Sequence, residues 1–332
     1  MKLAVTLDVE ADCQWDHGCP VNTRNVRSWP RFQELCDEYG VIPTYLLTSE
    51  MAADGLARDY LSNWQRQGLV EVGAHLHPWT TPPFVDTPGL RFNDQIHAFP
   101  SQLPTSLLQE KLHNLTREIA SAFGAVPTAF RAGRFGFDLR VAQALVQEGY
   151  VVDSSVTPLT SWRDTPGLPG EAGPDFSHCS VQPFRVSGSG GVPLIEIPVT
   201  VLPTYDVLRR HPTLLRAYQA KPARAIRKVL LRTWLQPQPM WLAPRPHYGP
   251  ADLLRVWRQA ERAGAKVAVM MFHSSELLPG GSPFRPTTES IRALYRCLAE
   301  FFREVRAGGG SFIGLTAAAR ELSAGELEVR GL

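Results

Sequence analysis

The sequence lacks several features that define whole classes of protein. No apolar run reaches the roughly 18 residues that a helix needs to cross a bilayer. Basic and acidic residues nearly balance, at 34 against 32, so the basic excess typical of nucleic-acid-binding proteins is missing. The five cysteines are odd in number and form no CxxC pair, which argues against a disulfide framework or a thiolate zinc site. The opening MKLAVTLDVE has no secretory pattern, so we expect a cytoplasmic protein.

What the sequence does contain is an alternation of strand and helix patterns. Apolar residues make up 44% of the 332 residues, enough for a sizeable core. Short apolar runs of the kind found in strands covered on both faces lie at 3–9, 41–47, 69–74, 126–131, 150–153, 193–201, 266–272 and 311–315. Helical patterns lie between them at about 28–39, 55–67, 104–123, 137–148, 250–264 and 285–306. Glycines that suit helix C-termini follow four of these patterns, at Gly40, Gly68, Gly149 and Gly264.

Seven or eight strand-then-helix units in one chain of this length predict an α/β barrel with a parallel sheet. We expect one domain over 1–332, with a helical insertion at about 205–235. Irregular stretches at 78–104, 156–193 and 236–250 are long for connections, and such loops commonly form the rim or lid of a site.

Ionisable residues gather where the predicted strands end. Because ligands of parallel α/β folds bind at the carboxyl ends of strands, we expect these side chains to converge on one face. They are Asp8, Glu10 and Asp12 after the first strand, His75 and His77 after the third, Arg131 and Arg134 after the fourth, Asp153 after the fifth, and His273 after KVAVMMF.

The pattern His75-Leu76-His77 suggests a metal site. Imidazoles two residues apart on an extended segment point to the same side, and a carboxylate opposite would complete three ligands with one open position. The alternative is an ordinary loop with one surface and one core histidine. Residues two apart on the first strand also share a face, so one carboxylate can bind the metal while another acts as a base. This spacing leaves open whether Glu10 or Asp12 is the ligand.

The remaining candidates have both a structural and a catalytic interpretation. Arg131 and Arg134, in FRAGRFG, suit bidentate binding of a carboxylate, although a structural ion pair is an equal alternative for each. A lone histidine such as His273 is more often structural. Beside a metal site, however, it is the group that can be cationic near pH 7 and protonate a leaving amine.

In this order, the segments TLDVE, EVGAHLHPW, FRAGRFG, DSSV and MMFHSSEL resemble the motif series of the polysaccharide deacetylase (NodB-homology, carbohydrate esterase family 4-like) family. The resemblance covers about 1–315. It is nearest to a branch associated with lipopolysaccharide biosynthesis, in which HLHPW and the phrase FP-x-x-LP, here at 99–104, recur.

The resemblance implies a deformed (β/α)7-type barrel and metal-dependent removal of N-acetyl groups from sugars. By position, Asp8 matches the catalytic base, Arg131 the arginine that orients it, His75 the first metal histidine and His273 the general acid. Asp153 matches, more loosely, the segment that tethers that acid.

Two positions depart from the family pattern. Val9 stands where the family has a metal-binding aspartate, and Trp79 stands where it has its second histidine. Glu10 and His77 would then supply the missing ligands, to a divalent ion that we expect to be Zn²⁺.

We therefore predict a metal-dependent amide hydrolase acting on an N-acetylated carbohydrate, such as a nucleotide- or lipid-linked precursor of surface polysaccharide. The alternatives are a hydrolase of a non-sugar C–N bond and a non-catalytic carbohydrate-binding or scaffold protein on the same fold. The predicted insertion at 205–235 carries eight Lys or Arg between Val207 and Trp234 and no acid, which suits an anionic ligand or peripheral contact with a membrane; a solvated helix face is the plainer interpretation.

Overall fold

The computed structural model describes residues 1–15, 20–84, 98–187, 194–203 and 239–331. The predicted insertion at 205–235, with its expected membrane or anion contact, lies outside these residues. Within them, no helix has the length and apolarity that crossing a bilayer requires.

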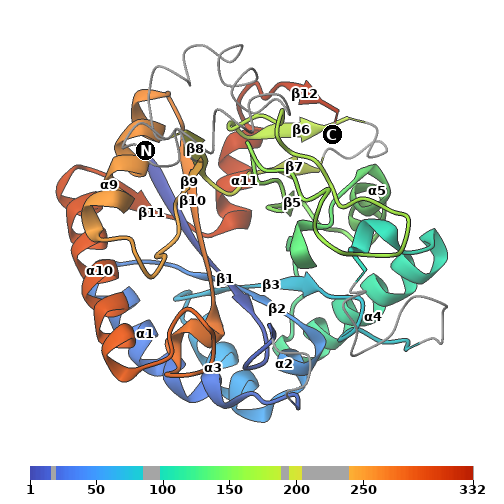
Figure 1. Cartoon of the computed structure of the whole chain (residues 1–332), viewed down its shortest axis with the longest axis horizontal. Coiled ribbons are helices and arrows are strands. Elements are labelled where there is room, and N and C mark those ends of the chain that lie inside the picture. Colours follow the sequence, from blue (N-terminus) through green and yellow to red (C-terminus); the bar gives the residue numbers. More distant parts are fainter. Residues whose placement is uncertain (16–19, 85–97, 188–193, 204–238, 332) are drawn as a thin grey trace.

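A curled, largely parallel sheet forms the centre of the molecule (Figure 1). Its strands lie in the order β10-β1-β2-β3-β4-β5-β7-β6-β12, with β11 also paired to β1; β6 runs antiparallel to β7. The strands of this sheet are β1 (Lys2–Val9), β2 (Thr44–Leu47), β3 (Glu71–Leu76), β4 (Ala129–Ala132), β5 (Val152–Asp153), β6 (Phe184–Val186), β7 (Ile195–Glu196), β10 (Val267–His273), β11 (Ser311–Phe312) and β12 (Val329–Arg330). A separate antiparallel pair joins β8 (Val201–Pro203) to β9 (Pro239–Trp241).

Helices surround the outer face of this sheet, as Figure 1 shows. They are α1 (Trp29–Tyr39), α2 (Ser49–Ala53), α3 (Gly55–Arg66), α4 (Thr105–Phe123), α5 (Leu139–Gln147), α9 (Pro250–Arg262) and α10 (Thr288–Ala307). A further helix, α11 (Leu315–Ser323), packs on the inner side of the sheet. Short 3₁₀ turns lie at Arg24–Ser28, Pro100–Gln102, Gly133–Phe135 and Ser274–Leu277. These elements confirm the expected deformed (β/α) barrel.

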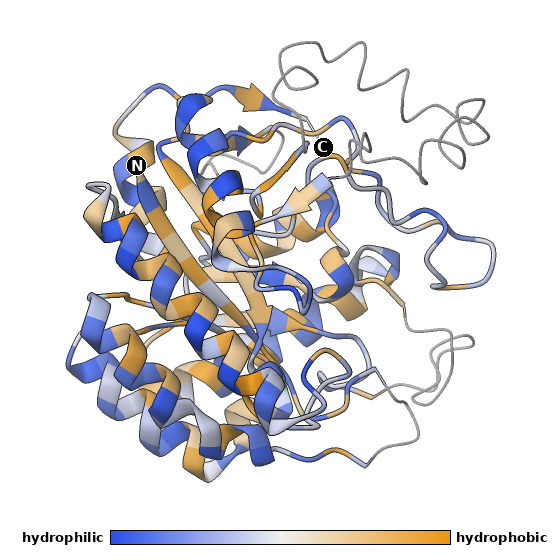
Figure 2. Ribbon diagram, turned by 60° about the vertical axis from the view of Figure 1, so that its left-hand side comes forward, coloured by the Kyte–Doolittle hydropathy of each residue, from blue (hydrophilic) through white to orange (hydrophobic). Residues whose placement is uncertain are grey.

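Amphipathic patterns explain why the helices pack where they do. In α10, apolar residues recur three or four positions apart and are buried, including Ile291, Leu294, Leu298 and Phe301. The Thr287 hydroxyl caps the helix by accepting a hydrogen bond from the Ser290 amide at 3.2 Å. The resulting division between apolar and polar faces is visible along the helices in Figure 2.

The barrel has an apolar layer on each side of its strands. Leu3, Val5 and Leu7 of β1 face the helices and belong to the large outer core. Ala4, on the opposite face, belongs to an inner cluster with residues from the other strands. Helix α11 packs its apolar side chains into this inner cluster near the amino ends of the strands. Apolar side chains therefore fill the barrel at the amino ends of the strands. The polar and ionisable side chains lie at the carboxyl ends.

Most predicted elements match the observed ones to within a few residues. All four predicted C-terminal glycines adopt positive φ, between 71° and 87°. The run at 193–201 forms two short strands in place of one, and the strand expected over 311–315 ends at Phe312. Leu315 instead begins α11, whose short alanine-rich sequence gives a weak helical pattern.

Candidate active site

Side-chain alternation along the strands directs the candidate residues into the barrel. In β1, Asp8 lies on the inner face with Ala4, and Glu10 continues the same alternation just after the strand ends. His75 in β3 and His273 in β10 lie on the inner faces of their strands. Asp8 and His273 are direct partners in the register between β1 and β10. The expected convergence at the carboxyl ends is thus observed for these residues.

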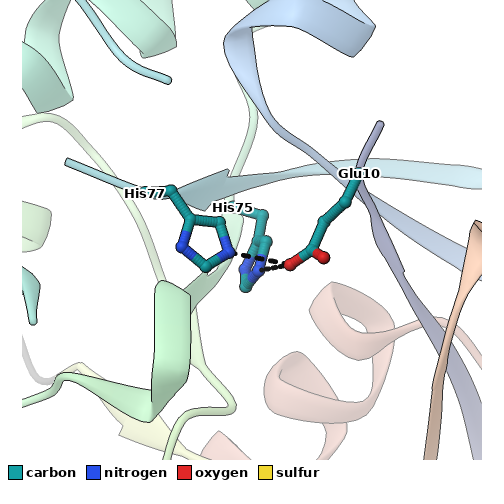
Figure 3. A group of neighbouring side chains, drawn as sticks. All are labelled: Glu10, His75 and His77. Atoms are coloured by element: carbon teal, nitrogen blue, oxygen red, sulfur yellow. Dashed lines mark hydrogen bonds and ion pairs between the residues drawn. The ribbon is translucent and has the colours of Figure 1, made fainter. Parts of the chain in front are cut away.

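Glu10, His75 and His77 form a compact group of possible metal ligands. One ligand atom from each lies within 4.8 Å of the others, and all three side chains are buried. Glu10 Oε1 is 3.0 Å from His75 Nε2 and 2.7 Å from His77 Nε2. Figure 3 shows the carboxylate of Glu10 reaching from the end of β1 toward both imidazoles.

The hydrogen bonding of His75 indicates which of its nitrogens can bind a cation. Nδ1 lies 2.8 Å from the carbonyl oxygen of Arg131, which can only accept, so Nδ1 carries the hydrogen. In the neutral ring, the lone pair of Nε2 then faces the Glu10 carboxylate. A divalent cation among these atoms removes that repulsion, and two imidazoles with one carboxylate are a donor set that Zn²⁺ favours. The residues present therefore fit a divalent metal ion.

The pKa shifts of Glu10 and His77 favour the charge states in which these side chains bind a metal ion. Although burial opposes it, the neighbouring histidines, chiefly His77, hold the pKa of Glu10 well below its usual range. Burial lowers the pKa of His77 and favours its neutral, ligating form. Burial also acts to lower the pKa of His75, but the Asp8 and Glu10 charges raise it overall. In the protein without a metal ion, a proton on His75 can offset the Glu10 charge.

Asp8 is held by a buried arginine. Arg131 Nη1 donates to Asp8 Oδ1 at 2.5 Å, and neither side chain is more than 3% exposed. The guanidinium also donates to the carbonyl and hydroxyl oxygens of Ser154. Burial alone would raise the pKa of Asp8, but Arg131, His75 and His273 together lower it, so the carboxylate is ionised at neutral pH.

His273 pairs with a carboxylate that we did not single out from the sequence. Its Nδ1 lies 3.4 Å from Glu276 Oε1, and Arg285 Nε lies 3.7 Å from the other oxygen of Glu276. Burial opposes the charged imidazole, but Glu10, Glu276 and Asp8 raise the pKa of His273 to about 9. The three-residue spacing in His273-Ser274-Ser275-Glu276 was the available signal for this pair.

Asp12 and Asp153 have other partners in the structure. Asp12 accepts hydrogen bonds from the backbone and side-chain amides of Asn25 at 3.0 and 2.8 Å, and thus fixes the segment before α1. It does not line the cavity described below, which makes Glu10 the carboxylate of the metal-ligand group. Asp153 accepts from Ser155 and is the register partner of Glu196 across β5 and β7. Among the described contacts, Glu276 and not Asp153 faces His273.

The loop that carries His77 is attached to helix α4 by a lysine. Lys111 is 2% exposed, and its ammonium group donates to the carbonyl oxygens of Pro78, Thr81 and Pro83 at 2.9, 2.5 and 2.8 Å. Burial lowers the pKa of Lys111 to about 8. These bonds fix the segment immediately after His77, which also contains Trp79.

A second loop packs closely on the same histidine. A Cβ atom added to Gly133 would lie 2.5 Å from His77 Nδ1 and 2.6 Å from the carbonyl oxygen of Leu76. The next two residues, Arg134 and Phe135, adopt φ values of 52° and 59°, which are unfavourable for residues with side chains. FRAGRFG thus brings its backbone against the metal-ligand group and directs two large side chains toward the cavity.

The cavity has a volume of about 580 Å³ and contains both the ionisable groups and many aromatic rings. Asp8, Glu10, His75, His77 and His273 all contribute to its lining. Several cavity residues were not among our sequence candidates, and most of them lie on loops that strand and helix patterns do not place: Trp15, Phe135, Trp162, Trp241, Arg245 and Phe284. The length of the predicted irregular stretches was the only sequence signal for Trp162, Trp241 and Arg245.

Solved structures with a similar fold include two proposed polysaccharide deacetylases. The protein from Mycobacterium smegmatis is 18% identical, with a TM-score of 0.57 over 100% of this chain and 93% of its own. The protein from Pseudomonas aeruginosa PAO1 is 15% identical, with a TM-score of 0.51 over 97% and 90% of the two chains.

A Puue allantoinase is also similar, at 14% identity and a TM-score of 0.50 over 97% of this chain and 89% of its own. No family model matches the sequence, and neither does any curated protein. At these identities the likeness concerns the fold, which the chain shares with all three proteins.

Proposed function

We propose that this protein is a metal-dependent hydrolase that removes the N-acetyl group from a sugar. The observation that carries the proposal is one cavity containing three distinct parts. These parts are the Glu10–His75–His77 ligand group, the Asp8–Arg131 pair and the His273–Glu276 pair. The motif resemblance and the fold shared with proposed polysaccharide deacetylases support the same activity.

Glu10, His75 and His77 would hold the ion, which we propose to be Zn²⁺. When bound, such an ion polarises an acetyl carbonyl and lowers the pKa of a water molecule at its open position. Asp8 is ionised and fixed by Arg131, so it can accept a proton from the attacking water as the new C–O bond forms.

His273 suits the opposite task of donating a proton. Glu276 faces its Nδ1, which leaves Nε2 as the nitrogen available to a leaving group in the cavity. A proton delivered to the amide nitrogen as the C–N bond breaks yields the free amine and acetate. The carboxylate base and the imidazolium acid therefore have the protonation states that this direction of reaction needs.

The substrate class follows from the resemblance to the lipopolysaccharide-associated branch. We propose a nucleotide- or lipid-linked precursor of surface polysaccharide, modified in the cytoplasm. In support, the FP-x-x-LP phrase packs on the site: a Cβ atom added to Gly136 would lie 2.5 Å from Pro100 and 2.7 Å from Phe99. This phrase thus supports the loop that contacts His77.

The test combines metal analysis with an acetate-release assay on N-acetylated sugars and nucleotide sugars. We expect about one divalent ion per chain, acetate release from at least one sugar, and loss of both in Glu10→Gln. A matched variant, Glu50→Gln, alters a half-buried glutamate outside the ligand group and should retain the ion. Stoichiometric metal without acetate release from any sugar would contradict the proposal.

Hydrolysis of a non-sugar C–N bond is a second candidate, favoured by the fold shared with an allantoinase. A cyclic ureide such as allantoin belongs in the same screen, with ureide loss as the measured quantity. Turnover of the ureide and of none of the sugars would assign the protein to this second activity. Sugar binding without bound metal or turnover would instead favour the carbohydrate-binding protein.

A further inference from the structure

One wall of the cavity is built from aromatic rings that come from three separate segments of the chain. Phe135 stacks on Trp162 with ring centroids 5.2 Å apart and an angle of 22° between the rings. Trp241 lies 5.8 Å from Phe135 and 6.3 Å from Trp162, so the three rings form one continuous surface. All three line the cavity that contains the metal-ligand group. None of them has a role in the proposed proton transfers.

Two arginines line the cavity together with this aromatic wall. The guanidinium carbon of Arg245 is 5.1 Å from the centre of the Trp241 ring. Arg134 precedes Phe135 in the chain, stacks 4.4 Å from the ring of Phe99 and donates to the Pro166 carbonyl oxygen. Both arginines line the cavity. In the described part of the chain, Arg245 is paired with no carboxylate.

The acids of the cavity already have partners within the protein. Asp8 is bound by Arg131, Glu10 faces two histidines, and Glu276 lies between His273 and Arg285. The positive charge of Arg245 is therefore not needed to neutralise these carboxylates. It can interact with a negatively charged group of a ligand.

The backbone at Arg134 and Phe135 gives independent evidence that this wall is functional. Two consecutive side-chain-bearing residues occupy the left-handed region, with φ of 52° and 59°. Strained conformations of this kind persist where the surrounding structure enforces them, and they concentrate at ligand sites. Here the unusual turn directs a cation and an aromatic ring toward the cavity.

We propose that Arg134, Phe135, Trp162, Trp241 and Arg245 form a subsite for a sugar that carries a phosphate or carboxylate group. The inference rests on the proposed function, which places the acetamido group at the metal-ligand group. The subsite would bind the rest of the sugar. The rings receive the apolar C–H face of the sugar, and the guanidinium groups bind the anion through paired hydrogen bonds. A neutral N-acetyl sugar would use the rings but offer the guanidinium groups no anion.

Ligand binding measured by tryptophan fluorescence tests this subsite without requiring turnover. The probes are N-acetylglucosamine, its 1-phosphate, its uronic acid and inorganic phosphate. We expect at least one of the two charged sugars to bind about tenfold more tightly than the neutral sugar, the effect of a charge-assisted hydrogen bond worth about 1.4 kcal/mol. Whichever charged sugar binds more tightly identifies the anion as phosphate or carboxylate.

Arg245→Gln should abolish the preference for charged sugars and leave binding of the neutral sugar unchanged. Arg134→Gln provides a second variant, at the residue that precedes Phe135. The matched control is Arg163→Gln, because Arg163 adjoins Trp162 but its side chain is 65% exposed and pairs with Asp175. This control should keep the preference. Trp241→Leu should weaken binding of the neutral and the charged sugars alike.

Several results would overturn the subsite. Equal affinity for neutral and charged sugars would do so. A preference that persists in both Arg245→Gln and Arg134→Gln would also do so, because the anion would then bind at the metal-ligand group. If inorganic phosphate bound as tightly as the sugar phosphate, the aromatic rings would contribute nothing to binding of the sugar. Failure of the proposed function has a different signature: no acetate is released from any sugar while the charge preference and its loss in Arg245→Gln remain.

Discussion

At the scale of single residues, Asp8 and Asp12 illustrate how one strand end can supply two different carboxylates. Asp8 faces the cavity and a buried arginine, whereas Asp12 turns to Asn25 and orders the backbone. Both are nearly inaccessible to solvent, at 2% and 4% exposure. Their difference in role therefore comes from their partners and not from burial.

Asp8→Asn should abolish turnover with a loss of about 10²–10⁴-fold, because the amide cannot accept the proton. It should also destabilise the fold, since removing one charge of a buried pair costs about 3–5 kcal/mol and leaves Arg131 uncompensated. Metal content should persist. The measurements are acetate release, denaturant unfolding and metal analysis.

Asp12→Asn is the matched control for that experiment. It weakens the contacts to Asn25 and Arg24 but touches no group that lines the cavity. We expect lower stability with unchanged turnover per folded molecule. Loss of metal in Asp8→Asn, but not in Asp12→Asn, would show that Asp8 is itself a ligand.

The pKa of His273 leads to a prediction about pH. Its value of about 9 in the protein without metal exceeds the ordinary value of 6.5, so folding favours the protonated form. This contribution to stability is complete below pH 6.5 and is lost as the pH rises through about 9. Metal-free wild type should therefore lose more stability between pH 6.5 and 9.5 than His273→Gln does.

NMR titration of the imidazole checks the same pKa directly. Glu276→Gln should lower it by removing an attractive charge, and added Zn²⁺ should lower it by offsetting the charge of Glu10. Glu289→Gln, at an exposed helix position, should leave it unchanged. An imidazole that titrates near 6.5 in the metal-free wild type would contradict the electrostatic assignment.

Strain at Arg134 predicts a difference between two substitutions that both remove the side chain. Glycine tolerates φ of 52°, whereas alanine retains the steric penalty. Arg134→Gly should therefore be more stable than Arg134→Ala by about 1 kcal/mol in urea unfolding. Equal stabilities would mean that the turn relaxes once the arginine is gone.

At the scale of elements, the contact between α4 and the loop after β3 deserves a test because it lies outside the cavity. Lys111→Met keeps the aliphatic chain but leaves three carbonyl oxygens without their donor. We expect a loss of stability of about 1–3 kcal/mol or more and a fall in metal affinity of about 10–100-fold, as for other groups that orient ligands. Calorimetric titration with Zn²⁺ measures that affinity.

Lys266→Met is the matched control, since Lys266 is exposed on the surface. It should bind metal as wild type does. Wild-type metal affinity in a folded Lys111→Met protein would show that the loop keeps His77 in place by itself.

Elements also differ in how far sequence patterns predict them. Long amphipathic helices such as α4 and α10 and the apolar strands β1 and β10 have strong periodicities, and their predicted positions agree with the structure. Strands β6 and β12 have only two or three residues; β6 pairs with β7 and β12, and β12 pairs with β6. A pattern of that length carries no periodicity, so tertiary pairing alone creates these strands.

The same distinction applies to the candidate site. Regular strands position Asp8, His75, Arg131 and His273, and the rule that parallel strands end at one face predicts their convergence. Trp162 reaches the cavity from an irregular segment, and Trp241 from the end of the short strand β9. Their positions depend on contacts between distant loops, which local sequence does not encode.

At the scale of the whole molecule, β1 lies between β2 and β10, its neighbours from opposite ends of the chain. Asp8 therefore faces His273, roughly 265 residues later in the sequence. At about 5–20 residues per second, synthesis separates these two strands by about 13–50 s. During this time, one edge of β1 has no β10 to pair with.

An unpaired edge of a buried strand can bind the same edge of another copy. The newly made chain is thus exposed to misassembly for as long as β10 is still on the ribosome, and in that interval Asp8 lacks the histidine that we propose as its acid partner. Expression at lower temperature or with chaperones that shield strand edges should increase the yield of folded protein. The proposed chemistry is consequently delayed until β10 has been made.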